Sequence, residues 1–471
     1  MKTNRTFDPT RRGLLRSMIG GTVLLPGIVS QLLGEDAAPS NPADPLAPKP
    51  THFPPKAKRV IWLHMSGGVS HVDSWDPKPK LFADAGKTVP VNEFQGRKGD
   101  YQMFLKRPQW DFTPHGQCGT EVSSLFPHLA ECVDDLCVIR SMKSDHTNHY
   151  EATLGIHTGS FTFARPSIGS WVSYGLGTVN RNLPSFVVIA PHSPYAGGQV
   201  WGSDFLPGSH QGTLVVPGPE PVANIQRRAA SSSLQELELG VMSKMNERHL
   251  GSRTGDPLLT ARIKSFETAF GMQAEMPEVF DLAKESDAAL KLYGLQRGST
   301  QGFAWQCLVA RRLAERGVRF VELIDVGSSN NWDAHGDMLT HAPLAKNVDQ
   351  PIAGLLRDLK LRGLLNDTLV VWTTEFGRTP FNSAADAKGR EHHHWVFSSW
   401  LAGAGVKPGI TYGESDEYGI DVGKDPVHIH DFHATILHLM GMDHERLTYR
   451  HSGRDYRLTD VHGRVVREVL A

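Results

Sequence analysis

Carboxylate, imidazole and guanidinium side chains recur shortly after short apolar runs in this 471-residue sequence. Carboxylate oxygens and imidazole nitrogens are the usual ligands of zinc, manganese and similar divalent ions. A neighbouring arginine can bind the oxygens of an anionic substrate through paired hydrogen bonds. Side chains of these types stand at His71, Asp73, Asn148, His149, Asp333, His335, Glu375, Arg378 and His392, and they are candidates for a divalent-metal site and, at Arg378, for contact with an anion.

The elements that must position these residues are short apolar strands separated by helical patterns. Strands are expected at residues 60–65, 136–142, 186–190, 320–324 and 368–373, and helices at 257–293, 302–316, 347–361 and 431–440. Buried strands that alternate with helices predict an α/β fold with a mostly parallel central sheet flanked by helices. Such sheets gather polar residues at the carboxyl ends of their strands, so we expect the candidate residues to meet at one rim.

Two stretches depart from this pattern. Residues 35–57 contain seven prolines and little apolar periodicity, which predicts an extended linker before a domain spanning residues 58–471. Residues 160–226 are rich in Gly, Pro and Ser, and we expect them to form an irregular insertion within that domain.

The N-terminal segment, residues 1–34, is similar to a twin-arginine export signal. Arg11 and Arg12 precede an apolar stretch of sixteen residues, 18–33, which is shorter than the ~20 residues needed to span a membrane. We therefore expect recognition by the twin-arginine translocase, a periplasmic or extracellular location, and no transmembrane span after signal removal. An uncleaved signal would instead leave an N-terminal membrane anchor.

Composition excludes several classes of function. The 49 Lys and Arg residues nearly balance 50 Asp and Glu residues, which argues against a nucleic-acid-binding protein. The sequence has no Walker loop, dinucleotide fingerprint or Gly-x-Ser-x-Gly turn, so nucleotide-dependent and serine-hydrolase functions lose their usual support. Four cysteines are too few for a disulfide scaffold, although a bridge between Cys118 and Cys132 stays open.

A group of motifs resembles one known family, the exported bacterial proteins called domain of unknown function 1501. The resemblance runs from about residue 58 to the C-terminus and includes Gly67-Gly68-x-Ser70-His71-x-Asp73, Trp332-Asp333-x-His335, Glu375-Phe376-Gly377-Arg378 and His430-Asp431-x-His433. That family is similar to the alkaline phosphatase and sulfatase superfamily. The resemblance implies a three-layer sandwich and metal-dependent cleavage of an anionic ester, with sulfated or phosphorylated glycans among the candidate substrates.

The resemblance also implies ligands for the metal. Asp333, His335 and His392 match the residues that hold one ion in the superfamily. At the second ion Glu375 can still coordinate, but Phe376 stands where a histidine is usual. The second site is therefore expected to be degenerate or rebuilt from His71 and Asp73. The resemblance implies a divalent metal, for which we expect zinc, with manganese, magnesium and calcium as alternatives.

The nucleophile stays open at this stage. Superfamily enzymes place it at a helix N-terminus about three turns before a Thr-Gly pair, and this interval leads back from Thr158 to His149, beside Asn148. His149 could attack or bind metal, Ser144 or Thr147 could supply a hydroxyl, and metal-activated water could attack directly. Two functions remain: a hydrolase of phosphate or sulfate esters, and a binding or scaffold protein with one structural metal.

Overall fold

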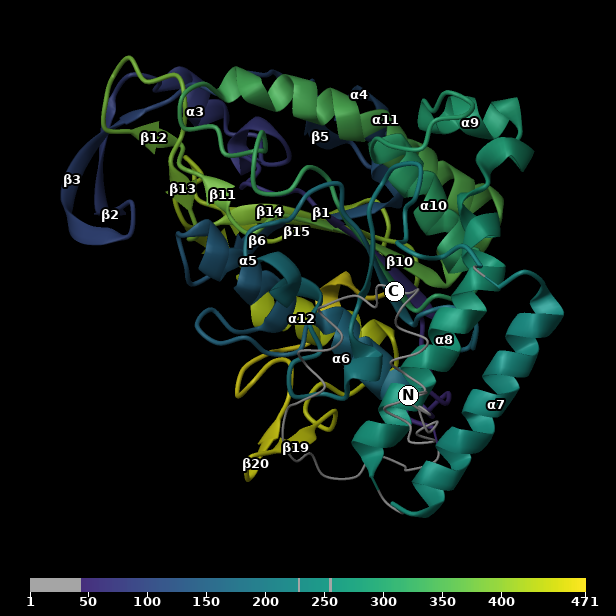
Figure 1. Cartoon of the computed structure of the whole chain (residues 1–471). Helices are drawn as coiled ribbons and strands as arrows, with labels where there is room; N and C mark the ends of the chain where they lie inside the picture. The colour runs from purple at the N-terminus through teal and green to yellow at the C-terminus, as the bar shows by residue number, and fades with distance from the viewer. Residues whose placement is uncertain (1–43, 228, 254–255) are drawn as a thin grey trace, which may run out of the picture.

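A nine-stranded mixed sheet forms the centre of the protein (Figure 1). The computed structural model describes residues 44–227, 229–253 and 256–471. The strands, in spatial order, are β15 (Ile410–Tyr412), β6 (Leu136–Lys143), β14 (Phe397–Ala402), β10 (Thr368–Thr373), β1 (Arg59–His64), β9 (Phe320–Ile324), β7 (Phe186–Ile189) and β8 (Thr213–Val215), with β18 (Val427–His428) also paired to β6.

The sheet is parallel except at one strand. β14 runs antiparallel to both of its neighbours, β10 and β6, whereas the other pairings in the sheet are parallel. The five strands expected from apolar runs are all present, and the prediction of a mostly parallel, helix-flanked sheet is confirmed.

Helices cover both faces of the sheet (Figure 1). One face carries α4 (Pro127–Ala130), α10 (Phe303–Glu315) and α11 (His341–Leu361), and the other carries α5 (His149–Thr158), α6 (Ile168–Leu176) and α12 (Ile429–Leu439). Strand β1 shows how the sequence fills both layers. Because successive side chains point to opposite faces, Ile61 and Leu63 join the core under α10 and α11, whereas Val60 and Trp62 join the core under α5 and α12.

The helix expected over residues 257–293 is two helices, so that prediction was wrong in its extent. α8 (Pro257–Phe280) follows α7 (Ser232–Gly251), and α9 (Asp287–Tyr293) comes after a break. Asp281 accepts a hydrogen bond from the amide of Ala283, and the side chain of Ser286 caps α9. Such short polar side chains satisfy backbone amides outside a continuous helix, and this ends one helix and starts the next.

Smaller sheets and two-stranded ribbons lie outside the main sheet. Strands β2 (Thr88–Phe94), β3 (Arg97–Leu105) and β12 (Phe381–Asn382) form a three-stranded sheet, and β11 (Gly377–Arg378) pairs with β13 (His392–His393). In the second pair Arg378 lies opposite His392, which brings two candidate site residues together. Further two-stranded ribbons are β4 (Phe112–His115) with β5 (Thr120–Ser123), β16 (Glu414–Ser415) with β17 (Val422–Lys424), and β19 (Tyr449–His451) with β20 (Arg454–Tyr456).

The stretch 160–226 supplies regular elements to the main fold: helix α6 and the sheet strands β7 and β8. Residues 44–57 lie along the domain. The amide of Lys49 donates to Leu176 O at 3.1 Å, and the amide of His52 donates to Gly441 O at 2.8 Å. The predicted export signal, residues 1–34, and the first residues of the predicted linker lie outside the described residues.

Among the residues that the structure describes, no helix has both the length and the apolar character needed to cross a bilayer. Cys118, Cys132, Cys137 and Cys307 all carry free thiols, so the bridge left open between Cys118 and Cys132 is not formed.

Candidate metal centre

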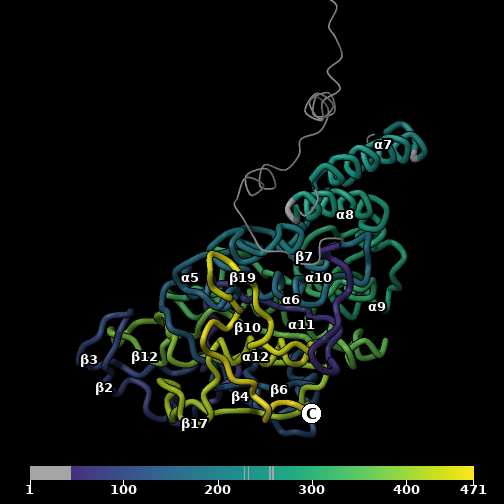
Figure 2. Tube along the Cα trace, turned by 90° about the horizontal axis from the view of Figure 1, so that it is seen from below, coloured from purple at the N-terminus to yellow at the C-terminus, as the bar shows by residue number. Residues whose placement is uncertain are grey.

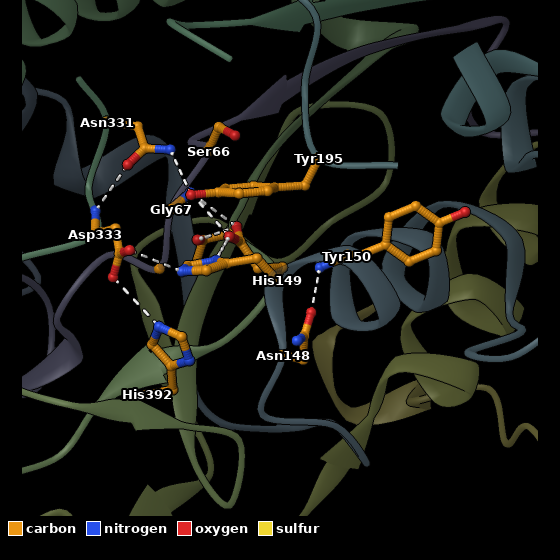
Figure 3. Close-up of polar contacts among 12 residues, drawn as sticks. Ser66, Gly67, Asn148, His149, Tyr150, Tyr195, Asn331, Asp333 and His392 are labelled. Atoms are coloured by element: carbon orange, nitrogen blue, oxygen red, sulfur yellow. Dashed lines mark hydrogen bonds and ion pairs between the residues drawn. The ribbon is translucent and has the colours of Figure 1, made fainter. Parts of the chain in front are cut away.

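Three of the candidate residues, His149, Asp333 and His392, lie together at the carboxyl-terminal edge of the sheet (Figure 3). The chain reaches Gly67 after β1, His149 after β6, Asp333 after β9 and Glu375 after β10, and His392 comes from the short strand β13. Three sheet strands therefore deliver polar side chains to one place, and a fourth, β1, brings the Gly67 amide there, as expected for a largely parallel sheet.

His149 is the first residue of α5 and is buried between two carboxylates. Its Nδ1 lies 2.7 Å from Glu375 Oε1, and its Nε2 lies 3.3 Å from Asp333 Oδ2 without forming a hydrogen bond. Burial alone would lower the pKa of His149, but Asp333 and Glu375 outweigh it and raise this pKa above its ordinary value. The Tyr195 ring stacks on the imidazole at 4.3 Å and fixes its plane (Figure 3).

His335 and His392 point their Nε2 atoms at the same carboxylate oxygen, Asp333 Oδ1, at 2.9 and 3.3 Å. Their other ring nitrogens face oxygen acceptors. His392 Nδ1 lies 2.6 Å from the carbonyl oxygen of Thr147, and His335 Nδ1 lies 2.6 Å from Glu391 Oε2. Because only a protonated nitrogen can donate to these oxygens, each neutral ring carries its proton on Nδ1 and a lone pair on Nε2.

Asp333 is the centre of this arrangement. Burial would raise its pKa, but contacts with His149, His335 and His392 hold this pKa well below the ordinary range of an aspartate. The amide of Asp333 donates to Asn331 Oδ1 at 3.1 Å, and Asn331 in turn donates to the Tyr195 hydroxyl at 3.1 Å. The loop after β9 is therefore held by Asn331 and by Tyr195 of a neighbouring loop, with the Asp333 carboxylate turned toward the imidazoles (Figure 3).

These donors fit a divalent cation. One ligand atom each from His149, Asp333 and His392 lie within 4.8 Å of one another, and His335 Nε2 lies 2.9 Å from His392 Nε2. In the neutral rings the three Nε2 lone pairs face the Asp333 carboxylate, while the Nδ1–H groups are held by Glu375, Thr147 and Glu391. Metal-bound histidines are oriented in this way, by a carboxylate or carbonyl on the nitrogen that does not bind metal.

Glu375 lies beside the cluster rather than at its centre. Its carboxylate accepts the amide of Gly67 at 2.9 and 3.1 Å, the Thr374 hydroxyl at 3.1 Å, and His149 Nδ1. Burial would raise its pKa, but His149 lowers it to about 2, so Glu375 is a carboxylate. Gly67 has φ +114°, and a Cβ there would lie 2.7 Å from the amide nitrogen of Trp332, so only glycine allows this approach.

Arg378, the residue predicted to bind substrate oxygens, is fully buried. It donates to the carbonyl oxygens of Gly67 and Gly68, and its Nη2 lies 2.6 Å from Asp333 Oδ1. Its Nη1 donates to Arg390 O at 3.3 Å. Because these partners take nearly all of its donors, this geometry favours holding Asp333 over contacting a ligand.

Three expected residues lie outside the cluster. Asp73 accepts the Ser70 hydroxyl at 2.5 Å, the Gln109 amide at 2.8 Å and Arg390 Nε at 2.7 Å, so its oxygens are already paired. His71 Nε2 faces Gly419 O at 2.9 Å. Asn148 caps α5 by accepting the amide of Tyr150 at 3.0 Å (Figure 3). The structure therefore does not rebuild a second metal site from His71 and Asp73.

Sequence reasoning did not assign roles to three supporting residues: Glu391, Asn331 and Tyr195. Glu391 and Asn331 are polar residues next to the motif residues His392 and Trp332. This position in the sequence is the one feature that could have pointed to their supporting roles. Tyr195 lies in the Gly- and Pro-rich stretch between β7 and β8. This stretch has no periodicity that would predict the contact of Tyr195 with His149.

A cavity of about 320 Å³ adjoins the cluster. Thr147 lines it, and the Thr147 carbonyl oxygen is the acceptor for His392 Nδ1. The other lining residues combine carboxylate, imidazole and indole groups: Glu93, Gly96, Asp145, His146, His394 and Trp395. Lys143 Nζ lies 4.5 Å from the Trp395 ring and covers one of its faces.

The model of the family "Protein of unknown function (DUF1501)" matches residues 57–470, nearly all of the described domain. The chain belongs to the DUF1501 family. This membership confirms the resemblance seen in the motifs. A comparison with curated proteins gives no significant match.

Several solved structures resemble this DUF1501 protein at low identity. The lipoteichoic acid synthase LtaP from Listeria monocytogenes is 10% identical with a TM-score of 0.36, over 92% of this chain and 80% of that one. The PsFucS1 sulfatase from Pseudoalteromonas sp. is 11% identical with a TM-score of 0.38, over 88% and 72%. Alkaline phosphatase from the Antarctic bacterium TAB5 is 12% identical with a TM-score of 0.31, over 78% and 96%.

Proposed function

We propose that this DUF1501 protein is a hydrolase of phosphate or sulfate esters that uses one divalent metal ion. His149, His335, His392 and Asp333 would hold the ion. The observation that carries the proposal is the common direction of three imidazole Nε2 atoms toward one carboxylate, with each Nδ1 held by an outer oxygen. The ester class comes from the resemblance of the motifs to the alkaline phosphatase and sulfatase superfamily.

The donor set favours zinc. Three imidazoles and one carboxylate suit its preference for nitrogen and oxygen ligands, although manganese accepts the same groups. Such an ion, when bound, supplies Lewis acidity to an ester oxygen and makes water a stronger nucleophile. The chain's own contribution is to hold Asp333 with Arg378 and to hold His149 with Glu375.

His149 has only one lone pair to offer. Its Nδ1 proton faces Glu375, so Nε2 either binds the ion or attacks the ester, and it cannot do both. Because Nε2 points at Asp333 together with the other two imidazoles, the ligand role fits better and water is the proposed nucleophile.

The adjoining cavity supports a carbohydrate as the alcohol part of the ester. Glu93, Asp145 and the imidazole of His394 can exchange hydrogen bonds with hydroxyl groups, and Trp395 offers an aromatic face. The two carboxylates disfavour a second anionic group in this position. We therefore propose a sulfated or phosphorylated glycan as the substrate class.

The test combines metal content with turnover of aryl phosphate and aryl sulfate esters. The wild-type protein should contain metal and hydrolyse one ester class, and His335→Ala should lose both properties. His115→Ala, on the β4–β5 ribbon, is the matched control and should keep them. Alkaline denaturation during turnover preserves a nitrogen–phosphorus bond and should reveal no phosphohistidine; a phosphorylated His149 would make this residue the nucleophile instead.

A second function is favoured by one observation. Phe376 is fully buried against His149, with ring centroids 4.8 Å apart, in the turn where the superfamily carries another ligand. A binding protein with one structural metal would then melt at a lower temperature after chelation while hydrolysing neither ester.

We also propose export by the twin-arginine route, on the basis of Arg11 and Arg12. Replacing both by lysine should leave the protein in the cytoplasm, which cell fractionation measures. A protein that still reached the periplasm after this change would exclude the route.

A further inference from the structure

The two residues expected to bind the substrate are engaged within the protein itself. Arg378 is buried and gives its donors to Asp333 and to backbone carbonyl oxygens. Asn148 caps α5 by accepting a backbone amide. A hydrogen bond from the chain to an anionic oxygen of the ester must therefore come from another side chain.

Tyr195 lies flat on His149, beside the cation site. The two ring planes differ by 7°, and their centroids lie 4.3 Å apart. The hydroxyl end of Tyr195 lies over the side of the imidazole that faces Asp333 (Figure 3). The side chains of Asp333 and His335 are 26% and 41% exposed, so the cluster is open to solvent on this side.

The hydroxyl of Tyr195 accepts one hydrogen bond and keeps its own proton available. Asn331 Nδ2 donates to this hydroxyl at 3.1 Å and to Gly327 O at 3.0 Å, while Asn331 Oδ1 accepts the amide of Asp333 at 3.1 Å. Because only the amide oxygen can accept from a backbone N–H, these contacts fix the direction of the Asn331 side chain. Among the described residues, no acceptor is hydrogen-bonded to the Tyr195 proton.

The loop that carries Tyr195 has a strained backbone. Ala196 has φ +61°, in the left-handed region that residues with a side chain rarely adopt. The amide of Ser328 donates to Ser193 O at 3.0 Å, which ties this loop to the loop after β9. Strained backbone persists where its surroundings hold it, and it is concentrated at binding and catalytic sites. This conformation therefore supports a binding role for Tyr195.

We propose that the Tyr195 hydroxyl donates a hydrogen bond to an anionic oxygen of the ester at the cation site. The inference rests on the function proposed above and names a substrate-binding residue in place of Arg378. A tyrosine hydroxyl keeps its proton at neutral pH, so it is a neutral donor that no change of protonation needs to prepare. Hydrogen bonds to charged acceptors are stronger than those between neutral groups.

The test compares Tyr195→Phe with the wild type, because phenylalanine keeps the ring on His149 and removes only the hydroxyl. The full-length proteins, incubated with zinc, are titrated with inorganic phosphate and with sulfate by isothermal titration calorimetry. Chelator competition measures their zinc affinity. The dissociation constant of the anion that the wild type binds more tightly should rise about tenfold in Tyr195→Phe, with zinc affinity unchanged.

Tyr418→Phe is the matched control. It removes a hydroxyl that donates to Asp84 Oδ2 at 2.7 Å. Tyr418 lies in the turn between β16 and β17, and β17 lies well apart from α5 (Figure 2). This variant should leave the affinities for zinc and for both anions unchanged.

Turnover gives a second measurement. For an ester that the wild type hydrolyses, Tyr195→Phe should raise KM about tenfold with kcat nearly unchanged, because the bond is present before and during the reaction. An unchanged anion affinity in Tyr195→Phe, a wild type that binds neither anion, or loss of zinc from Tyr195→Phe would overturn the proposal. A hydroxyl-dependent anion affinity without any turnover would support the assignment of Tyr195 and reject the hydrolase function.

Discussion

His335 Nε2 and His392 Nε2 lie 2.9 Å apart, and each ring has its Nδ1 against an oxygen acceptor. Two neutral rings held in this way would present lone pair to lone pair, which is repulsive unless a positive charge lies between them. Without a metal, a proton serves this purpose: hydrogen bonds to Asp333 and Glu391 raise the pKa of His335 to about 9. A positive charge on or between the two rings, supplied by a proton or by a metal ion, therefore relieves this repulsion.

Replacing Gly389 by alanine should disturb this centre from outside it. A Cβ at position 389 would lie 1.9 Å from the carbonyl oxygen of His335, so the backbone that carries the imidazole must move. We expect a loss of stability of about 1–3 kcal/mol and weaker metal binding. Urea denaturation and competition with a metal chelator measure the two effects.

The matched control is Gly336→Ala, because a Cβ there meets no atom within 4 Å. This variant should stay within about 0.5 kcal/mol of the wild type. Equal effects of the two substitutions would show that the close approach of Gly389 to His335 has no consequence.

Arg378→Met should be strongly destabilising. The substitution removes the partner of Asp333 and leaves the buried carbonyl oxygens of Gly67 and Gly68 without their donor. Breaking one side of a buried ion pair costs about 3–5 kcal/mol. Arg450→Met, in an ion pair whose side chains are both 56% exposed, should cost less than about 1 kcal/mol in the same denaturation experiment. A similar cost at both positions would contradict the structural role of Arg378.

Glu375→Gln should weaken the hydrogen bond that holds His149 without leaving a cavity in the core. The amide is nearly the same size but carries no charge, and it can satisfy only part of the set formed by Gly67, Thr374 and His149. Loss of such an outer partner typically lowers metal affinity or activity 10–100-fold. Glu417→Gln, at a 58% exposed side chain, is the control. Unchanged zinc affinity and unchanged ester turnover in Glu375→Gln would exclude this supporting role.

The buried His210 should make the protein sensitive to acid. Burial, together with the nearby charge of Lys49, lowers the pKa of His210 to about 3. Its Nδ1 lies 2.9 Å from the Ser173 hydroxyl, and the Tyr174 ring packs edge-on at 5.7 Å, so Lys49 is the charged group that faces it. The unfolded chain, with a histidine pKa of about 6.5, takes up this proton first as the pH falls.

The contribution of His210 is therefore fully present above pH about 6.5 and is lost as the pH falls toward about 3, at up to about 1.4 kcal/mol per pH unit. His210→Gln should flatten the dependence of the unfolding free energy on pH across this range, whatever its effect at neutral pH. His115→Gln, on the β4–β5 ribbon, should leave the slope unchanged. Equal slopes for the wild type and His210→Gln would refute the assignment.

The part of the site that sequence could predict is the part carried by strand ends. Asp333 and Glu375 follow buried parallel strands directly, so the topology alone brings them to one edge. His71 and Asp73 also follow such a strand, but a short 3-10 helix turns them away and Arg390 pairs with Asp73. The contact of Tyr195 with His149 depends on a loop without periodicity, which sequence patterns do not place.

The capping of α8 and α9 shows a similar limit. Apolar spacing continues across residues 281–286, whereas the helix stops there because Asp281 and Ser286 bind backbone amides. Periodicity measures which face is buried, and hydrogen bonds of single side chains decide where a helix ends.

The central claim is that one cation binds among His149, His335, His392 and Asp333. Anomalous diffraction from crystals soaked in zinc tests it most directly. We predict one strong peak about 2.0–2.2 Å from the three Nε2 atoms and an Asp333 oxygen, absent in His392→Ala crystals. A peak elsewhere, or no peak at these four side chains, would contradict the account.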